Sequence, residues 1–421
     1  MNILVIGSGG REHAFVWSLS RSKQNPKIFC APGNPGIAAL AECIDIQPSD
    51  GEALVRFAKE KSIDITLVGP EMPLAEGLVD LFKVNHLPIF GPTKAAALLE
   101  SSKIHSKEFC DRHHIPQANY KIFDNALEAK ESLSRKSYPL VIKANGLAFG
   151  KGVSICQNEA EAILAIDKML VEKCFGEAGC RIVIEEFLKG EEASFIAVVD
   201  GKHVLPLSSA RDYKRLLNGD KGPNTGGMGS ISPATIIHGD LYEKVMERIM
   251  IPAVRGMAAE GAPFVGFLYA GLMIENGDPH LLEFNVRMGD PEAQVILPRL
   301  KTDLVSIIEA ALAGRLGDML LSWETKISAC VVMASGGYPE EYETGFPIQG
   351  LEELSDISGV LAFHSGTKKN GTHILTAGGR VLGITGLGND LQAALDCAYE
   401  AVSKISWEGC QYRTDIGRNQ K

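Results

Sequence analysis

The first hundred residues alternate between two hydrophobic periods. Strands are predicted by short apolar runs at residues 3–7, 27–31, 63–69 and 87–91. Helices are predicted by apolar residues at three- and four-residue spacing in 11–22, 51–61 and 73–85. Such alternation is typical of a parallel, doubly wound sheet, so we predict an α/β fold that begins with this sheet. Thr93 is placed to cap one further helix.

After residue 100 the pattern becomes mixed. Helices are predicted at 101–116, 158–170, 241–261 with an interruption at Pro252, and 291–316. Strand pairs are predicted at 138–156, around a glycine loop, and at 267–287, around Asn276–Gly277. Three strands are predicted in 181–207, with turns at 189–190 and 200–201.

The remaining segments predict a loop and a small terminal domain. Residues 211–233 are polar and glycine-rich, which predicts a loop. Beyond residue 323, short strand-like runs and a helix at 390–405 predict a small α+β or barrel-like C-terminal domain. The chain as a whole is therefore expected to be α/β, and α+β in part.

Residues 281–292 combine three polar side chains at the spacing of a strand. Alternation places apolar residues on one face, Leu282, Phe284, Val286 and Met288, and polar ones on the other, Glu283, Asn285 and Arg287. Carboxylate and amide oxygens two residues apart suit Mg²⁺. A guanidinium fork suits a carboxylate or a phosphate. The alternative is an edge strand whose outer face is solvated.

Two glycine-rich segments are typical of loops that hold anions. GSGGREH at 7–13 joins a strand to a helix N-terminus, but Glu12 occupies the third glycine position of a dinucleotide fingerprint, which disfavours NAD. GLAFGKGV at 146–153 lies between two strands and predicts a β-hairpin flap over phosphates, not a Walker loop. Lys143, on the preceding strand, is expected to need an anionic partner. The alternatives are a ligand-free turn and a mobile hairpin with an exposed lysine.

Two further segments suggest ligand contacts more weakly. Residues 182–192 run from an apolar strand into paired glutamates, which suits backbone contacts to an adenine edge and a carboxylate on a ribose. GPNTGGMG at 222–229 follows Asp212 and Lys214 and suits a backbone that approaches a ligand closely. The alternatives are a solvated acidic turn and a disordered loop.

Composition limits the classes of molecule that the chain is expected to bind. The chain has 421 residues, 45% hydrophobic and 22% charged, which is typical of an enzyme with several domains. Its formal net charge of −10 disfavours nucleic acid or an anionic membrane as the main partner. The nine cysteines form no C-x-x-C pair, so reduced thiols are expected. Without a signal peptide or a long apolar run in the sequence, a cytoplasmic protein is expected.

The segments together resemble one enzyme family. They are GSGGREHA, APGNPG at 31–36, VGPE at 68–71, GLAFGKGV, VIEEFLKGEEASF, GPNTGGMG, GFLYAGLM and EFNVRMGDPE. In this order they resemble the phosphoribosylamine–glycine ligases, also called glycinamide ribonucleotide synthetases, of the ATP-grasp superfamily. The resemblance covers nearly the whole chain. Phe149 in the flap and Met288 in the segment 281–292 depart from the usual family pattern. Both residues flank proposed ligands without being ligands themselves.

The family resemblance implies a domain layout and a reaction. It implies a doubly wound domain at 1–100, an ATP-grasp domain of two α+β subdomains at 101–324, and a C-terminal domain at 325–421. Residues 117–190 are implied to form a mobile lobe that clamps ATP. The implied reaction joins glycine to 5-phosphoribosylamine through a glycyl phosphate, in the second step of de novo purine synthesis. The implied partners are these small molecules, and the implied state is a monomer or weak homodimer.

The resemblance also assigns the site. Glu283 and Asn285 are implied to bind Mg²⁺ or Mn²⁺. ATP is implied to contact Lys103, Lys143, Gly146, Gly150, Lys151, Gly152, Glu185, Leu188 and Glu192, with backbone adenine contacts at Glu185 and Leu188 and the ribose on Glu192. The other substrates are implied to contact Gly9, Gly10, Arg11, Asn224, Thr225, Gly226 and Arg287. The catalytic set is implied to be Arg287, Lys143 and Asp212.

Two other functions remain open at this point. The first is another ATP-grasp acyl ligase, such as a carboxylase of the biotin or aminoimidazole type, which would use bicarbonate in place of glycine. The second is a nucleotide-sensing module that keeps the fold without turnover. No Ser–His or Cys–His pair is evident in the sequence, which is consistent with a reaction that needs no protein nucleophile.

Overall fold

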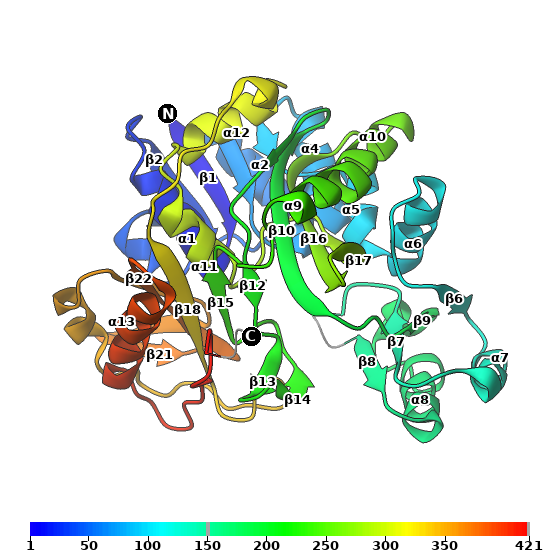
Figure 1. The fold of residues 1–421 in the computed structure, drawn as a ribbon. Helices are drawn as coiled ribbons and strands as arrows, with labels where there is room; N and C mark the ends of the chain where they lie inside the picture. Colours follow the sequence, from blue (N-terminus) through cyan, green and yellow to red (C-terminus); the bar gives the residue numbers. More distant parts are fainter. Residues whose placement is uncertain (149–151, 419–421) are drawn as a thin grey trace.

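The N-terminal part of the computed structural model is a parallel five-stranded sheet in the order β3-β2-β1-β4-β5 (Figure 1). The structure describes residues 1–148 and 152–418, and gives only the backbone of Arg135 and Glu177. The strands are β1 (Asn2–Gly7), β2 (Lys27–Pro32), β3 (Glu42–Cys43), β4 (Ile65–Val68) and β5 (Ile89–Phe90). The prediction of a doubly wound sheet is confirmed, and the short β3 was not predicted.

Four α-helices connect these strands, and two of them replace a single helix predicted from the sequence. They are α1 (Gly10–Ser20), α2 (Gly51–Glu60), α3 (Glu71–Glu76) and α4 (Leu78–Val84). The single helix predicted at 73–85 is wrong because Gly77 adopts a left-handed φ of +97° and ends α3. The predicted cap at Thr93 is confirmed, since its hydroxyl accepts a hydrogen bond from the N–H of Ala96 at the start of α5 (Lys94–Ser101).

A small lobe hangs below the rest of the molecule on the right in Figure 1. It is an antiparallel sheet in the order β6-β9-β7-β8, packed against α7 (Ala126–Glu131) and α8 (Glu159–Ile166). Its strands are β6 (Tyr120–Phe123), β7 (Leu140–Ala144), β8 (Val153–Cys156) and β9 (Ile182–Glu186). The lobe has a hydrophobic core of its own, and α6 (Lys103–Arg112) leads into it.

The central sheet is antiparallel, in the order β11-β10-β16-β17. Its strands are β10 (Glu191–Asp200), β11 (Val204–Pro206), β16 (Val265–Glu275) and β17 (Asp278–Asn285), with α9 (Asp240–Val245) and α10 (Ile251–Ala259) outside. One continuous hydrophobic core joins this sheet to the N-terminal one. The predicted hairpin turn at Asn276–Gly277 is confirmed, with φ of +52° and +78°.

Two predictions around this sheet are wrong. Residues 189–190 do not close a hairpin, because β9 and β10 belong to different sheets and the chain crosses from the small lobe to the central sheet there. The segment 211–233 is not only loop. It contains β12 (Arg211–Asp212), β13 (Arg215–Leu217), β14 (Lys221–Asn224) and β15 (Gly229–Ser232). These short, polar and glycine-rich strands lack the apolar alternation by which strands are recognised.

The C-terminal part shares a sheet with the centre of the chain. The order β12-β15-β18-β22-β19 combines two strands from residues 211–232 with β18 (Ile327–Ala334), β19 (Val360–His364) and β22 (Arg380–Gly388). The hairpin β20 (Thr367–Asn370) and β21 (His373–Thr376) and the predicted helix α13 (Leu391–Lys404) complete it. Helices α11 (Ala293–Ile296) and α12 (Leu304–Leu312) connect the central sheet to this part. None of the helices described is long and apolar enough to cross a bilayer.

Candidate functional site

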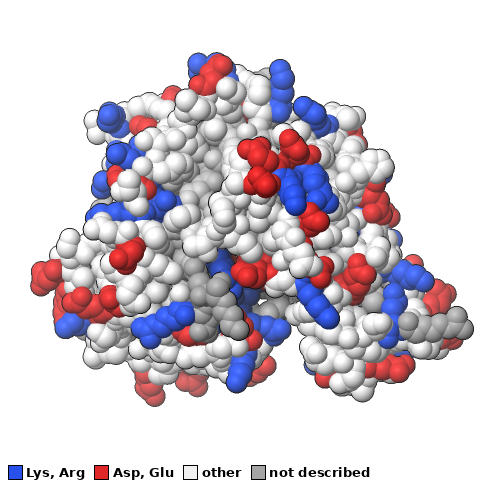
Figure 2. Space-filling view, viewed as in Figure 1, with Lys and Arg blue, Asp and Glu red and all other residues white. Residues whose placement is uncertain are grey.

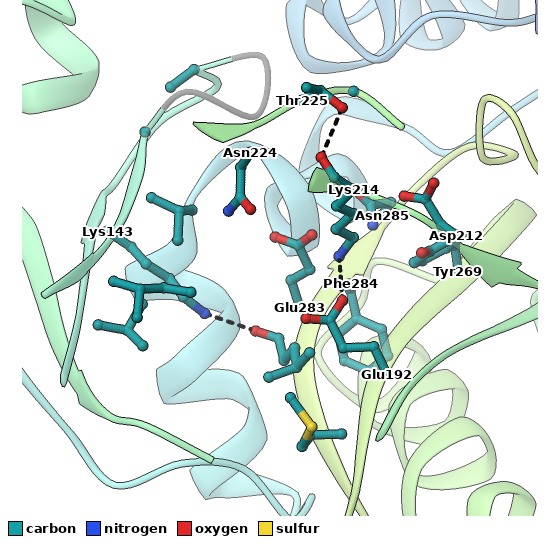
Figure 3. Close-up of a pocket in the computed structure, with 18 of the residues that line it drawn as sticks. Lys143, Glu192, Asp212, Lys214, Asn224, Thr225, Tyr269, Glu283, Phe284 and Asn285 are labelled. Atoms are coloured by element: carbon teal, nitrogen blue, oxygen red, sulfur yellow. Dashed lines mark hydrogen bonds and ion pairs between the residues drawn. The ribbon is translucent and has the colours of Figure 1, made fainter. Parts of the chain in front are cut away.

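A cavity of about 960 Å³ lies where the small lobe, the central sheet and the C-terminal part meet. Figure 3 shows its side chains, and on the face seen in Figure 2 basic and acidic residues gather at the hollow between the lobe and the C-terminal part. Most of the described site residues predicted from the sequence line it. They are Arg11, Lys103, Lys143, Gly152, Glu185, Leu188, Glu192, Asp212, Asn224, Thr225, Gly226, Glu283, Asn285 and Arg287.

A bulge at the end of β17 points Glu283 and Asn285 into the cavity. Gly271 pairs with Glu283 and Leu272 pairs with Leu281, so Leu282 has no partner across the strands. The predicted face is therefore wrong at Leu282. Leu281 and Phe284 are buried, three residues apart, whereas Leu282 lines the cavity and its carbonyl accepts a hydrogen bond from Lys143.

The carboxylate of Glu283 lies among the positively charged side chains of the cavity. Burial alone would raise its pKa, but Lys214, Lys103 and Lys143 outweigh that effect and lower it. An ionised carboxylate that faces a polar cavity suits a divalent cation. Asn285 offers the second oxygen, which here accepts a hydrogen bond from Arg287 at 3.2 Å.

These two oxygens fit a metal that arrives with a nucleotide. Across 1–148 and 152–418, no three His, Cys, Asp or Glu side chains form a dedicated cage. Mg²⁺ is usually held by one or two protein oxygens, with substrate phosphates and water completing the shell. One carboxylate and one amide beside several lysines match that donor set.

Lys143 has the anionic partner that the sequence analysis expected. Its ammonium lies 2.9 Å from Glu185 Oε2, and Lys107 lies 3.2 Å from Glu185 Oε1. All three side chains are buried. Desolvation lowers the pKa of Lys107 although Glu185 opposes this. The triad thus fixes two lysines at the cavity wall.

The backbone contact of Glu185 with adenine stays a prediction. The Glu185 backbone lies inside the small-lobe sheet, opposite Tyr120 on β6 and Val141 on β7, and this arrangement does not favour the predicted backbone contact with adenine. Its side chain is instead the counter-ion of two lysines. The chain that follows β9, residues 187–190, lines the cavity as it crosses between the sheets and includes Leu188.

Lys214 connects Glu192 to the glycine-rich segment. Its ammonium lies 3.4 Å from Glu192 Oε2, and this neighbour is the main cause of its raised pKa. Its carbonyl accepts hydrogen bonds from both the N–H and the hydroxyl of Thr225, each 2.8 Å long. Thr225 is thereby held beside Asn224 at the cavity wall (Figure 3).

Arg287 is held by two acidic residues of the N-terminal half. Its guanidinium lies 3.0 Å from Glu100 and 3.3 Å from Glu71. Burial raises the pKa of Glu100 to about 7 even though Arg287 opposes the shift. Glu71 keeps a lowered pKa, because Arg287 and Arg11 outweigh the effect of burial. The predicted substrate-binding arginine therefore enters the cavity with a fixed orientation.

A second acidic group, Asp212 with Glu292, also lines the cavity. Asp212 Oδ1 is buried and accepts no hydrogen bond, and burial followed by Glu292 raises the pKa of Asp212 well above its usual range. Glu292 accepts a hydrogen bond from Ser194, whose hydroxyl also contacts the Tyr269 hydroxyl at 2.8 Å. A carboxyl group without a partner at a cavity wall is suited to bind an amine.

The glycine turn before α1 reaches the cavity only through Arg11. Gly9 and Gly10 are not among the described residues that line it. The N–H of Gly9 is bonded to Glu12 and that of Arg11 to Asp290, so carboxylates of the chain already occupy this helix N-terminus. A free anion would have to displace them.

The flap predicted at 146–153 is described only at its ends. Gly150 and Lys151 lie outside the described residues, as does Phe149. Gly146 lies at the base, where its N–H is bonded to the Ala178 carbonyl and its own carbonyl accepts a hydrogen bond from Lys103 at 3.4 Å. Gly152 reaches the cavity wall.

Several cavity residues were missed by the sequence analysis. They are Glu71, Glu100, Lys107, Tyr269, Asp290, Glu292, Tyr338, Tyr342 and Arg380. Glu71 belongs to VGPE, and Asp290 and Glu292 belong to GDPE. Both segments are part of the family resemblance, which could have identified these three residues. Tyr338 and Arg380 lie more than a hundred residues from the glycine-rich segment and only the fold brings them to it.

Comparison with known proteins finds matches along the chain. Family models described as phosphoribosylglycinamide synthetase N domain, ATP-grasp (A) domain and C domain match residues 1–100, 101–293 and 328–419. A phosphoribosylamine–glycine ligase of Ralstonia nicotianae is 49% identical over 418 residues, which is 99% of each chain. One from Allochromatium vinosum is 50% identical over 420 residues, covering 99% of this chain and 98% of the relative.

Solved structures agree. The crystal structure of a phosphoribosylamine–glycine ligase from Thermotoga maritima covers 99% of this chain and 100% of its own, with a TM-score of 0.86 and 35% identity. The biotin carboxylase domain of a Hydrogenobacter thermophilus 2-oxoglutarate carboxylase, solved with MgADP and bicarbonate, has a TM-score of 0.72 over 98% of this chain and 91% of its own. At 18% identity, that likeness shows the fold alone.

Proposed function

Because the chain belongs to the phosphoribosylglycinamide synthetase family, we propose that it joins glycine to 5-phosphoribosylamine. ATP is converted to ADP and phosphate, and the product is glycinamide ribonucleotide, formed in the second step of de novo purine synthesis. The observation that carries the proposal is the meeting of three separate segments at one cavity. These are the Lys143–Glu185 pair, the Glu283–Asn285 strand end and the loop 224–226.

ATP binds between the small lobe and the central sheet in this proposal. Lys143 and Lys103 neutralise its phosphates, and residues 146–152, a stretch described only at its ends, cover them. Adenine lies against the crossing chain at Leu188, and Glu192 takes the ribose. The separate hydrophobic core of the small lobe supports its movement as one body during closure.

Glu283 and Asn285 would hold the metal, Mg²⁺ or Mn²⁺, which would supply charge neutralisation for the ATP phosphates. The protein's own side chains orient the substrate and neutralise charge on the phosphoryl group. Arg287, fixed by Glu71 and Glu100, orients the glycine carboxylate toward the γ-phosphate. Lys143 neutralises charge on the phosphoryl group as it moves.

The reaction is a two-step transfer. A glycine carboxylate oxygen attacks the γ-phosphorus, ADP leaves, and a glycyl phosphate remains. The nitrogen of phosphoribosylamine then attacks the glycyl carbonyl, the C–O bond to phosphate breaks, and the amine proton leaves with the phosphate. Asp212, with its unpaired Oδ1, binds the amine side, and Arg11, Asn224, Thr225 and Gly226 line the path of phosphoribosylamine.

The layout proposed with this function has domains at 1–100, 101–324 and 325–421, with 117–190 as the mobile lobe. The proposed setting is the cytoplasm, where reducing conditions keep the nine free cysteines as thiols. A monomer or weak homodimer suffices, because one chain supplies the lining described above.

The test is ADP release in the presence of glycine and phosphoribosylamine generated in situ, with the product identified by mass. The proposal expects ADP and glycinamide ribonucleotide in equal amounts and no turnover when bicarbonate replaces glycine. Turnover with bicarbonate would favour a carboxylase instead. ATP binding without turnover on either substrate would favour a nucleotide-sensing module.

A further inference from the structure

The last described segment of the chain, residues 411–418, is hydrogen-bonded to the β13–β14 hairpin. Asn218 Nδ2 donates to Thr414 Oγ1 at 2.6 Å, and the N–H of Thr414 donates to Asn218 Oδ1 at 3.0 Å. The N–H of Gly219 donates to Asp415 Oδ2 at 2.7 Å. Three bonds thus join the hairpin turn to residues almost two hundred positions later.

Arg413 is the buried centre of this contact, with 1% of its side chain exposed. Nη1 donates to the Arg215 carbonyl at 3.1 Å and to Asp220 Oδ1 at 2.7 Å. Nε and Nη2 donate to the two oxygens of Asp415 at 2.7 and 2.8 Å. The guanidinium also lies over the Tyr213 ring, 5.3 Å from its centroid.

The hairpin carries one wall of the cavity. Tyr213 and Arg215 line the cavity at its start, and β14 ends at Asn224, the first residue of the predicted substrate loop. At the far end of that loop the N–H of Gly226 donates to the Tyr338 hydroxyl at 2.9 Å. The loop is therefore bounded by two C-terminal contacts, one at the hairpin and one at Gly226.

We propose that Arg413 is a positioning residue that holds the β13–β14 hairpin, and through it the 224–226 loop, in the geometry that accepts phosphoribosylamine and glycine. It acts through the hairpin and does not touch substrate. The identity of the substrates rests on the proposed function, whereas the coupling of the C-terminal segment to the loop rests on the contacts themselves.

The charges and the anchor of the segment explain why an arginine is required. One guanidinium serves both oxygens of Asp415, a carbonyl and Asp220, which a single ammonium nitrogen lacks the fork to do. The segment is fixed to α13, because the Tyr399 hydroxyl donates to the Arg413 carbonyl at 3.0 Å and accepts from the N–H of Ile416. The arginine thus connects a fixed helix to an edge hairpin.

The test compares Arg413→Lys with the wild-type protein in two measurements. Hydrogen exchange of the apo protein is expected to speed up in residues 215–226 and to stay unchanged in β18. In steady-state kinetics, kcat/KM for phosphoribosylamine is expected to fall about 10- to 100-fold, because small misplacements of positioning groups have effects of this size. The KM for ATP is expected to change less than about twofold.

Controls separate this result from general damage. Arg418→Ala removes a cation of the same segment that stacks on Tyr399, and is expected to leave both measurements unchanged. Asp415→Asn attacks the same contact from the other side and replaces Arg413→Lys if that variant does not fold. Unchanged exchange in 215–226 would overturn the proposal, as would an equal loss for ATP. If the wild-type protein shows no glycine-dependent turnover, the proposed function fails while the exchange result still decides the positioning role.

Discussion

Replacement of Arg287 by methionine tests whether this arginine is held by Glu71 and Glu100. Methionine keeps much of the side-chain length and removes the charge and all donors. Glu100, 3.0 Å from the guanidinium, would lose its counter-ion, and Glu71, now 3.3 Å from it, would keep only Arg11 at 3.9 Å. Breaking a buried ion pair from one side costs about 3–5 kcal/mol, because the carboxyl left behind must either stay charged without a partner or take up a proton on folding. We expect a loss of that size in the free energy of unfolding at pH 8.

The loss is expected to shrink in acid. In the wild-type protein the pKa of Glu100 is raised from 4.5 to about 7, so the folded state holds this proton more tightly than the unfolded chain. The stability that this proton contributes is present below pH 4.5 and disappears as the pH rises through 7. Without Arg287 the pKa of Glu100 rises further, so the Glu100 carboxyl of the folded variant is already protonated at pH 8. Between pH 8 and pH 6 the difference from wild type should fall by about 1 kcal/mol.

Urea unfolding of the apo proteins at pH 8 and pH 6 measures both quantities. Arg287→Lys is the matched control, which keeps one charge and loses the fork, and it should show a smaller loss of stability together with a raised substrate KM or a lowered kcat. A pH-independent difference between methionine and wild type would refute the role of Glu100. Unchanged kinetics in the lysine variant would make Arg287 a structural residue only.

Three other predictions follow from the same contacts. Glu283→Ala should lose several kcal/mol of transition-state stabilisation and abolish metal-dependent turnover, and wild-type-like rates at low Mg²⁺ would contradict the metal assignment. Lys143→Met should lower kcat by about 10²-fold or more and raise the KM for ATP, because it removes the cation that Glu185 holds, and an unchanged KM and kcat would contradict this role. Burial and then His364 lower the pKa of His13 from 6.5 to about 3, so the folded state disfavours the protonated ring and stability is lost as the pH falls below 6.5. Between pH 7.5 and pH 5 the wild-type protein should therefore lose about 2 kcal/mol more unfolding free energy than His13→Asn, as measured by urea unfolding at both pH values, and an equal change in the two proteins would contradict the burial of a neutral His13.

The sequence predicts elements well where one hydrophobic period dominates. The parallel sheet of the first hundred residues, the Asn276–Gly277 hairpin and the terminal helix α13 all appear as expected. The Glu283 and Asn285 side chains enter the cavity because the strand alternation is correct up to that end of β17. These features depend on local spacing, which the sequence contains.

Other features depend on contacts between distant segments. The bulge at Leu282 shifts the strand by one residue, and no composition signal marks it. Glu185 serves as the counter-ion of two lysines because β7 brings Lys143 and α6 brings Lys107 beside β9. The segment β15 is a strand because it pairs with β18, and β12 in turn pairs with β15. A pattern confined to a few neighbouring residues cannot record partners that lie more than a hundred positions away.

The five-stranded sheet that combines β12 and β15 with β18 has a practical consequence for dissecting the chain. A truncation between residues 324 and 325 would separate β15 from β18, which pair from Gly229 to Ser232. Because β15 keeps β12 and β18 keeps β22, each fragment would then present one unpaired edge on a strand of buried residues, a template for aggregation. We expect the two fragments to be insoluble when expressed alone and to recover solubility when coexpressed, so that biochemical work on the C-terminal part should use point variants in the whole chain.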